Sequence, residues 1–142
     1  MPVSGEQRPE YFEFASRQLG ETWSHGPCCK CLTSLSGTGK IQAVVIFDLM
    51  TDVDCRLNIA TDGKRRWLSK AFLAWIFRVA FVQWSMRRVS ALVEAHNAQS
   101  VKMVERLGFV QEGVLRKAFG EQDGILFGML REECRYLDIE VD

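Results

Sequence analysis

The chain has no excess charge of either sign and no long uninterrupted apolar run. Lys and Arg number 18 and Asp and Glu number 18 among 142 residues, so the formal net charge is zero. Proteins that bind nucleic acid usually carry a basic excess, so we expect no nucleic-acid partner. The longest apolar stretch, 71–86, is interrupted by Arg78 and Gln83 and is shorter than a membrane span of roughly 20 residues. It therefore predicts a buried helix and no membrane partner.

A targeting signal, an internal repeat and a long linker are also absent from the sequence. The first ten residues are polar and contain Pro2 and Pro9, without the apolar core of a secretory signal. The length and the mix of 47% hydrophobic and 25% charged residues are typical of one globular domain. We expect a single domain over 1–142, located in the cytoplasm.

The cysteines lack the spacing of a metal site. There are five, and an odd number without a secretory signal indicates free thiols in a reducing compartment. His25, Cys28, Cys29 and Cys31 lie within seven positions, which suggests zinc. Structural zinc sites normally use two separated ligand pairs, and no second pair follows. We therefore favour free thiols at the start of a strand and expect no metal; stoichiometric zinc in the purified protein would reverse that choice.

Apolar periodicity and turn residues predict an α+β chain. Helices are expected over 9–19, 66–81 and 97–107, and strands over 29–36, 41–50, 55–60, 88–95, 109–115 and 125–131. A short reversal between 41–50 and 55–60 predicts an antiparallel hairpin. A helix separates 55–60 from 88–95, which predicts a parallel pair with a right-handed crossover. The order of elements predicts three layers, with a mixed central sheet and helices on both faces.

The loop before the longest helix has the features of an anion site. Gly63 is followed by Lys64, Arg65 and Arg66, and the predicted helix begins there. The first turn of a helix carries amide hydrogens without intrahelical partners and a partial positive charge, which favour a phosphate or pyrophosphate. Glycine also lets the backbone approach a ligand closely. The alternative is a solvated basic turn, and the loop alone does not choose between the two.

A motif in the second half of the chain points to a family. Residues 95–116 read AHNAQSVKMVERLGFVQEGVLR, with Asn-x-x-Ser, a helix ending in Glu-Arg-Leu-Gly-Phe, and Glu-Gly-x-Leu-Arg. This segment closely resembles the signature that closes the GCN5-related N-acetyltransferase family, in the version of the ribosomal-protein alanine acetyltransferase branch. The resemblance covers 41–137, and 1–40 match only in having a first helix and strand. Compact chains of this kind also resemble acetyltransferase-like proteins of bacteriophages.

The resemblance implies acetyl-CoA as cofactor, bound between two parallel strands that splay apart, here 55–60 and 88–95. It implies direct transfer of the acetyl group in a ternary complex to an amine: a protein N-terminus, a lysine or a small amine. The cofactor-binding residues that it implies lie on the first strand, on the pyrophosphate loop and after the second strand: Asn58, Ile59, Ala60, Gly63, Lys64, Arg65, Arg66, Trp67, Leu68, Ser69, Asn97 and Ser100.

Two positions depart from the family pattern. Arg65 stands where a small residue is expected, and its side chain would either crowd the pyrophosphate or bind it from one side. Val104 stands where many members have a tyrosine that protonates the departing thiolate. A thiol with a pKa near 8.5 leaves without a strong acid, so the loss of this tyrosine is tolerable.

Three side chains are candidates for the general base that takes a proton from the amine. Glu94 and His96 would share one strand face by alternation, and Asp48 lies on the hairpin. Each also has a simpler interpretation: a loop residue beside the helix for His96, a solvated or paired strand-end carboxylate for Glu94, and a solvent-facing strand residue for Asp48. A backbone amide near 58–60 would stabilise the tetrahedral oxyanion.

The competing function is a catalytically weakened binding or structural module on the same fold, such as a virion-associated phage protein. Its partners would be further copies of the chain or virion proteins, and its location the host cytoplasm or the virion.

Overall fold

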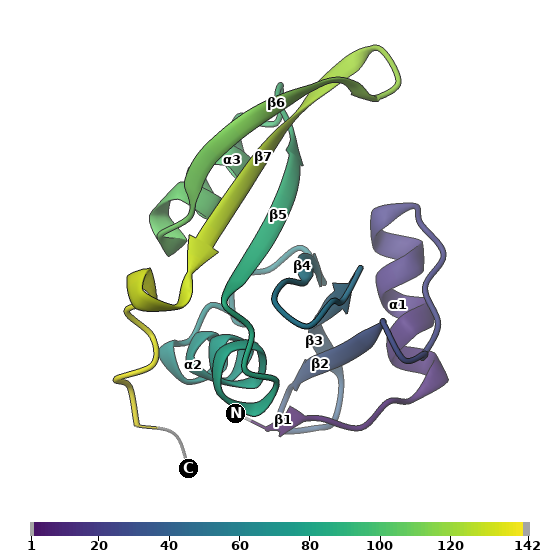
Figure 1. Cartoon of the computed structure of the whole chain (residues 1–142). Helices are drawn as coiled ribbons and strands as arrows, with labels where there is room; N and C mark the ends of the chain where they lie inside the picture. The colour runs from purple at the N-terminus through teal and green to yellow at the C-terminus, as the bar shows by residue number, and fades with distance from the viewer. Residues whose placement is uncertain (1, 141–142) are drawn as a thin grey trace.

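The computed structural model describes residues 2–140, in which seven strands form one sheet flanked by helices on both faces (Figure 1). The strand order is β1-β2-β3-β4-β5-β7-β6. The elements in chain order are β1 (Val3–Ser4), α1 (Pro9–Leu19), β2 (Lys30–Leu35), β3 (Ile41–Asp48), β4 (Arg56–Thr61), α2 (Lys70–Arg78), the π-helical turn η1 (Val79–Gln83), β5 (Arg88–Glu94), α3 (Ala98–Leu107), β6 (Val110–Phe119), β7 (Gln122–Leu130) and the 3-10 turn η2 (Arg131–Glu133).

The predicted fold class is confirmed. The hairpin of β3 and β4 is antiparallel over six residue pairs, from Ala43↔Thr61 to Asp48↔Arg56. β4 and β5 are parallel, and they share a single pair in register, Arg56↔Ser90. β5 then pairs with β7 antiparallel over seven residues. Figure 1 shows β5, β7 and β6 diverging from β4 beyond that one pair, so the sheet consists of two half-sheets joined at one end.

Two apolar layers hold the helices to the sheet. On one face α1 packs Tyr11, Phe12 and Ala15 against alternate residues of β3, among them Val44 and Ile46. On the other face α2, α3 and the C-terminal segment enclose the larger cluster, with fully buried side chains such as Phe47, Phe72, Phe77, Phe81 and Phe127. β3 is apolar at nearly every position because both of its faces are covered.

The helix predicted over 66–81 begins later than expected. α2 starts at Lys70 because the Ser69 hydroxyl accepts a hydrogen bond from the Phe72 N–H at 3.1 Å, which is a helix N-cap. The segment 64–69 is therefore a turn rather than the first turn of the helix. At its other end the helix continues as the π-helical turn η1. The basic residues 64–66 thus lie on a loop in front of the helix.

The other predicted elements agree with the structure in type. α1 has the predicted bounds, with Pro9 in the first turn and Gly20 at φ 70° after the last. β6 and β7 are longer than expected, because their hairpin continues to a tight turn at Gly120, φ 76°. The short strand β1 was not predicted. Within the part of the chain that the structure describes, no helix has the length and apolarity to cross a membrane.

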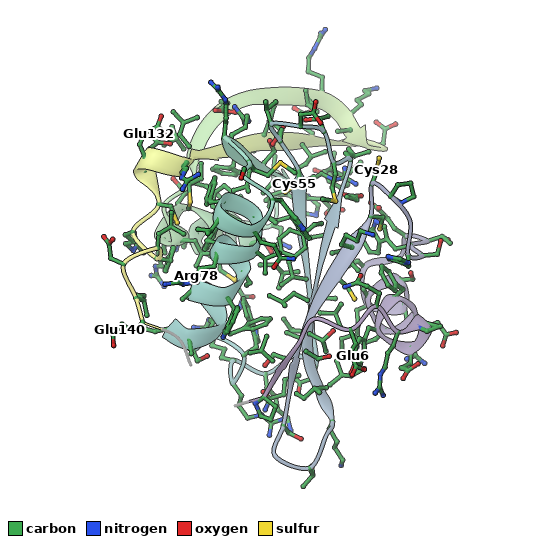
Figure 2. The ribbon with its side chains drawn as sticks, turned by 60° about the horizontal axis from the view of Figure 1, so that its bottom comes forward. Glu6, Cys28, Cys55, Arg78, Glu132 and Glu140 are labelled. Carbon is green, nitrogen blue, oxygen red and sulfur yellow. The ribbon has the colours of Figure 1, made fainter. Side chains whose placement is uncertain are left out.

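The cysteine-rich segment forms a turn before β2. Gly26 and Cys29 form an isolated antiparallel bridge, and the His25 Nε2 lies 2.8 Å from the Lys30 Nζ. Cys28 is exposed and Cys55 is buried, as can be followed in Figure 2. Burial raises the pKa of both Cys31 and Cys55 to about 12, which keeps these thiols protonated at neutral pH. Residues 2–140 contain no group of three His, Cys, Asp or Glu side chains placed to hold a metal ion.

Candidate cofactor and acceptor site

The candidate site is the gap that opens between β4 and β5. The Ser90 N–H donates to the Cys55 carbonyl at 2.8 Å, so the backbone groups of Cys55 face β5. Alternate residues of a strand direct their backbone groups to the same side, so Leu57, Ile59 and Thr61 also face the gap. Within residues 2–140 no pair of β4 and β5 beyond Arg56↔Ser90 is in register to close it. The gap therefore offers an unpaired strand edge to an extended ligand.

A basic cavity of about 760 Å³ lies at the outer end of this gap. The loop before α2, the helix α3 and the C-terminal segment contribute to its lining. Six of its lining side chains are basic and none is a carboxylate; the basic ones are Lys64, Arg65, Lys70, Lys102, Arg106 and Arg135. The α2 N-terminus adds amide hydrogens and a partial positive charge. This arrangement fits a ligand that carries several phosphates.

The loop at this cavity is shaped by local hydrogen bonds. The Asp62 Oδ1 accepts from the Lys64 N–H at 2.9 Å, and the Thr61 Oγ1 accepts from the Gly63 N–H at 3.1 Å. Gly63 has φ 87°, a conformation that glycine adopts without strain. These contacts turn the chain sharply after β4, so that Lys64 and Arg65 line the cavity.

Most of the predicted cofactor-binding residues line the gap, and three do not. The residues on the basic cavity are Ile59, Gly63, Lys64, Arg65, Trp67, Leu68 and Ser100. Arg66, Ser69 and Ala60, which were also predicted to bind the cofactor, are in the lining of neither cavity. Arg66 pairs with Asp62 at 3.0 Å, Ser69 caps α2, and Ala60 is buried against α1.

An inner cavity of about 410 Å³ adjoins the basic one. The two share lining residues from β4, α2 and α3: Ile59, Leu73, Ser100, Met103 and Leu107. The inner cavity also reaches the segment after α1, through Glu21 and Trp23, and the tip of the β6–β7 hairpin, through Phe119. Its charged lining residues are Glu21, Arg56 and Glu94. Asn58 and Asn97, both predicted at the cofactor, line this cavity.

Asp48 does not have the surroundings of a general base. Its carboxylate accepts hydrogen bonds from Arg56 Nε and Nη2 at 3.1 and 2.8 Å, from Asn58 at 2.8 Å and from the Trp23 indole at 3.0 Å. Burial raises the pKa of Asp48, but these donors and the Arg56 charge outweigh it, and the net pKa is lowered. Asp48 was also expected to face solvent if it had no catalytic role, whereas it is buried. Its role is to hold Arg56, Asn58 and Trp23 at the cavity wall.

Glu94 and His96 are brought together at the end of β5. The His96 Nε2 lies 3.3 Å from the Glu94 Oε2, and both side chains are partly exposed. Glu94 lines the inner cavity and His96 does not. Asn97 caps α3 as predicted, because its Oδ1 accepts from the Ser100 N–H at 3.1 Å. Of the three proposed bases, Glu94 is the one that lines the cavity.

Several site residues were not predicted. Lys102 and Arg106 are four positions apart on α3, a spacing that places both on one helix face and that was present in the sequence. Arg135 and Tyr136 come from the segment beyond residue 131, where no helix or strand was predicted. The Tyr136 ring stacks on Phe77 at 4.9 Å, and Arg135 donates to the Arg106 carbonyl. No local sequence signal marks these two residues.

Comparisons with known proteins agree with this architecture. No family model matches the chain. A segment of 69 residues is 36% identical to the SPbeta prophage-derived uncharacterized N-acetyltransferase YokL of Bacillus subtilis (strain 168). That match covers 46% of this chain and 39% of the relative, so the chain matches about two fifths of the relative's length.

Two solved structures show the fold. A spermidine N-acetyltransferase SpeG chimera from Vibrio cholerae and hSSAT superposes with a TM-score of 0.78 at 14% identity, over 96% of this chain and 98% of that one. The ribosomal-protein-S18-alanine N-acetyltransferase from Escherichia coli superposes with a TM-score of 0.71 at 21% identity, over 91% and 92%. At these identities the likeness concerns the fold alone. The chain has the fold of the GCN5-related N-acetyltransferases.

Proposed function

We propose that this chain transfers an acetyl group from acetyl-CoA to a primary amine. The observation that carries the proposal is the gap between β4 and β5, which leads from the basic cavity to the inner cavity. Acetyl-CoA has three matching parts: phosphates, an extended arm with amide groups, and an uncharged thioester. The name of YokL, an N-acetyltransferase, supports the same activity.

The residues of the chain suit each part of this donor. Lys64, Arg65 and the start of α2 would hold the pyrophosphate, with Arg106 and Arg135 on the opposite wall. The backbone of β4 would hydrogen-bond the arm. Among 58–60, Ile59 is the residue whose amide faces the gap, which makes it the donor that we assign to the oxyanion. Acetyl-CoA supplies a thioester carbonyl that is open to attack by an amine.

At the inner cavity, Glu94 would accept the proton that the amine loses. Its contact with the exposed His96 gives that proton a route to solvent. An α-amino group, with a pKa near 8, is more often neutral at pH 7 than a lysine amine near 10.4. A protein N-terminus or another amine of low pKa is therefore the acceptor class that needs least help from the base.

Val104 bears on the competing function. It is buried, lines the inner cavity and has no group that could protonate the leaving thiolate. This observation favours a binding or structural module that kept the fold and the donor site but lost turnover. In that case the partners would be further copies of the chain or virion proteins, and acetyl-CoA would bind without being consumed.

Calorimetry and a transfer assay distinguish these functions. We expect acetyl-CoA to bind with micromolar affinity and to acetylate at least one member of a panel of alanine-terminated peptides, lysine peptides and polyamines. Binding without transfer to any of these amines would support the module. No binding at millimolar acetyl-CoA would contradict the proposed function.

A further inference from the structure

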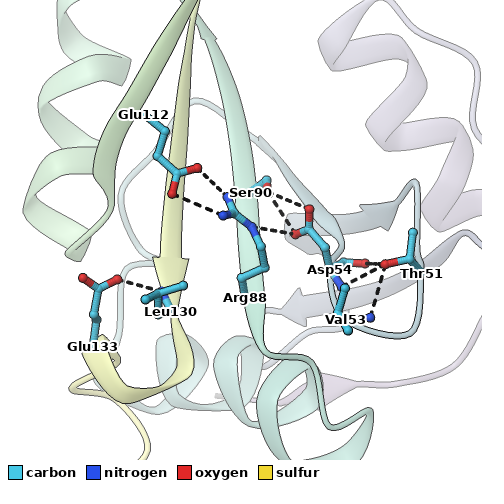
Figure 3. Close-up of polar contacts among 8 residues, drawn as sticks. All are labelled: Thr51, Val53, Asp54, Arg88, Ser90, Glu112, Leu130 and Glu133. Atoms are coloured by element: carbon cyan, nitrogen blue, oxygen red, sulfur yellow. Dashed lines mark hydrogen bonds and ion pairs between the residues drawn. The ribbon is translucent and has the colours of Figure 1, made fainter.

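The closed end of the gap contains a polar network that the proposed function does not use (Figure 3). Ser90, the β5 member of the single pair between the half-sheets, is at its centre. The Ser90 hydroxyl lies 2.9 and 3.0 Å from the two carboxylate oxygens of Asp54, to which it donates, and it accepts from the Arg88 guanidinium at 3.2 Å. Arg88 in turn donates to both carboxylate oxygens of Glu112, at 3.2 and 2.5 Å. The network connects the turn before β4 to β5 and β6.

The fold leaves room for this network. Arg88 on β5 and Glu112 on β6 reach each other across β7, the strand between them, at Gly128. A Cβ atom at position 128 would collide with both side chains. Gly128 has no positive φ, and the ion pair occupies the space that a side chain there would take, so a larger residue at 128 would displace the ends of Arg88 and Glu112.

The turn that carries Asp54, at the other end of the network, is fixed by its own hydrogen bonds. The Thr51 hydroxyl accepts from the N–H groups of Val53 and Asp54 at 3.2 and 3.0 Å, and the Thr51 N–H donates to the Asp54 carbonyl at 2.8 Å. The Val53 carbonyl accepts from the Arg87 N–H at 2.9 Å. Asp54 therefore projects from a fixed turn, and its carboxylate has a defined position relative to β5.

These contacts lie where the two half-sheets meet. On one side are β1 to β4 with α1, and on the other are β5, β7 and β6 with α3. The backbone hydrogen bonds between them, from Ser90 to Cys55 and from Arg87 and Arg88 to Val53, are at this same end. A small rotation here would change the separation of the strands further along the gap, where Ile59 lies. The side-chain contacts that cross between the half-sheets both end on the Asp54 carboxylate: the hydrogen bonds of the Ser90 hydroxyl, and the ion pair of the Arg88 Nε at 3.6 Å. They resist such a rotation because hydrogen bonds to a charged group depend on direction as well as distance.

We propose that Asp54, Ser90, Arg88 and Glu112 form a clamp that sets the width of the gap and thereby positions β4 for the extended arm of the acyl donor. The inference rests on the proposed function. None of the four residues lines either cavity, so the clamp acts through the strands and not by touching the ligand. They are positioning residues, and a preorganised gap binds its ligand more tightly because less ordering accompanies binding.

The test compares two ligands on three clamp variants: Asp54→Asn, Ser90→Ala and Glu112→Gln. Acetyl-CoA carries the phosphates and the arm, whereas adenosine 3′,5′-diphosphate carries phosphates without the arm. We expect each variant to bind acetyl-CoA about 10-fold more weakly and the diphosphate within about twofold of the wild type. Glu121→Gln is the matched control. It removes a different ion pair, between Glu121 and Lys117 at 3.7 Å, which lies at the tip of the β6–β7 hairpin and far from the clamp.

The outcomes separate the clamp from the proposed function. Variants that melt at a lower temperature but bind both ligands like the wild type would show a purely structural network and overturn the clamp. Equal weakening of both ligands would also overturn it, since it would indicate a general loss of the binding site. A wild-type protein that does not bind acetyl-CoA contradicts the proposed function, and the clamp for that ligand with it. If Asp54→Asn does not fold, the result for Ser90→Ala tests the clamp, because that substitution removes one hydroxyl and changes no charge.

Discussion

The two cavities along the gap differ in charge although the chain as a whole is neutral. The basic cavity has six cationic lining residues and no carboxylate, whereas the inner cavity has Glu21, Glu94 and an Arg56 that is already paired with Asp48. Equal totals of acidic and basic residues therefore conceal a separation of charge along one gap. A ligand with anionic and uncharged ends, and an acceptor that is an amine, match this separation.

Removing the Glu94 carboxylate from the inner cavity is expected to have the largest effect. If Glu94 accepts the proton of the amine, Glu94→Gln lowers kcat about 100-fold, because general base catalysis contributes at least this much. The affinity for acetyl-CoA stays unchanged, since Glu94 does not line the basic cavity. Steady-state kinetics and calorimetry on the same protein measure both quantities.

His96→Ala is the matched control for Glu94→Gln. It removes the partner of Glu94 but no residue of the cavity lining, so we expect a fall in kcat of less than about 10-fold. Rates unchanged in both variants would eliminate both side chains as bases.

Removing the basic side chains of the loop before α2 tests the role of the basic cavity. We expect Lys64→Ala combined with Arg65→Ala to weaken acetyl-CoA binding about 30-fold, because two charge-assisted contacts to phosphate are lost. The weakening should shrink at high salt, which screens exposed charges. Arg66→Ala is the control in the same loop, since Arg66 pairs with Asp62 and lies outside the cavity lining. An equal effect of Arg66→Ala would contradict the assignment.

Asp48→Asn tests the part of the inner wall that is structural. We expect a loss of about 2 kcal/mol of folding free energy at pH 7, because Arg56 loses its charged partner. The pKa of Asp48 is lowered from its ordinary value of 3.8, so the unfolded chain binds a proton more readily than the folded one. The stabilisation is therefore present above about pH 4 and is lost as the pH falls through the folded pKa. Urea denaturation of both proteins should show a stability difference that is constant near neutrality and narrows in acid.

The smallest expected effect decides the role of Arg65. Its exposed side chain lines the basic cavity, so Arg65→Ala should weaken acetyl-CoA binding about fivefold. Tighter binding by this variant would show that the arginine crowds the pyrophosphate. Calorimetry with the single variant is sufficient.

Local signals in the sequence predicted the parts of the site that depend on local structure. The cap at Asn97, the end of α3 at Gly108 and the hairpin of β3 and β4 all follow from residues close together in the chain. The start of α2 was wrong by four positions, although Ser69 is itself a favoured N-cap residue. The predicted helix began at the basic residues, before Ser69, and therefore included this capping serine.

Features that depend on register or on distant segments could not be predicted. Asp48 faces Arg56 because the hairpin register opposes them, and that register decides whether the carboxylate is a base or a structural acceptor. Successive amides of a strand point to opposite sides, so among 58–60 either the middle residue or its two neighbours face the gap. That the residue is Ile59 follows from the hydrogen bond between Ser90 and Cys55, which the sequence does not show. Arg135 reaches the basic cavity through its contact with α3, 29 positions earlier in the chain.

Hydrogen–deuterium exchange of the β4 backbone tests the central claim most directly. The account predicts that saturating acetyl-CoA slows exchange in the peptide covering 58–61, which lies beyond the single pair Arg56↔Ser90 between β4 and β5, and that adenosine 3′,5′-diphosphate does so much less. Unchanged exchange in this peptide, with acetyl-CoA bound elsewhere on the protein, would contradict the claim that the gap receives the acyl donor.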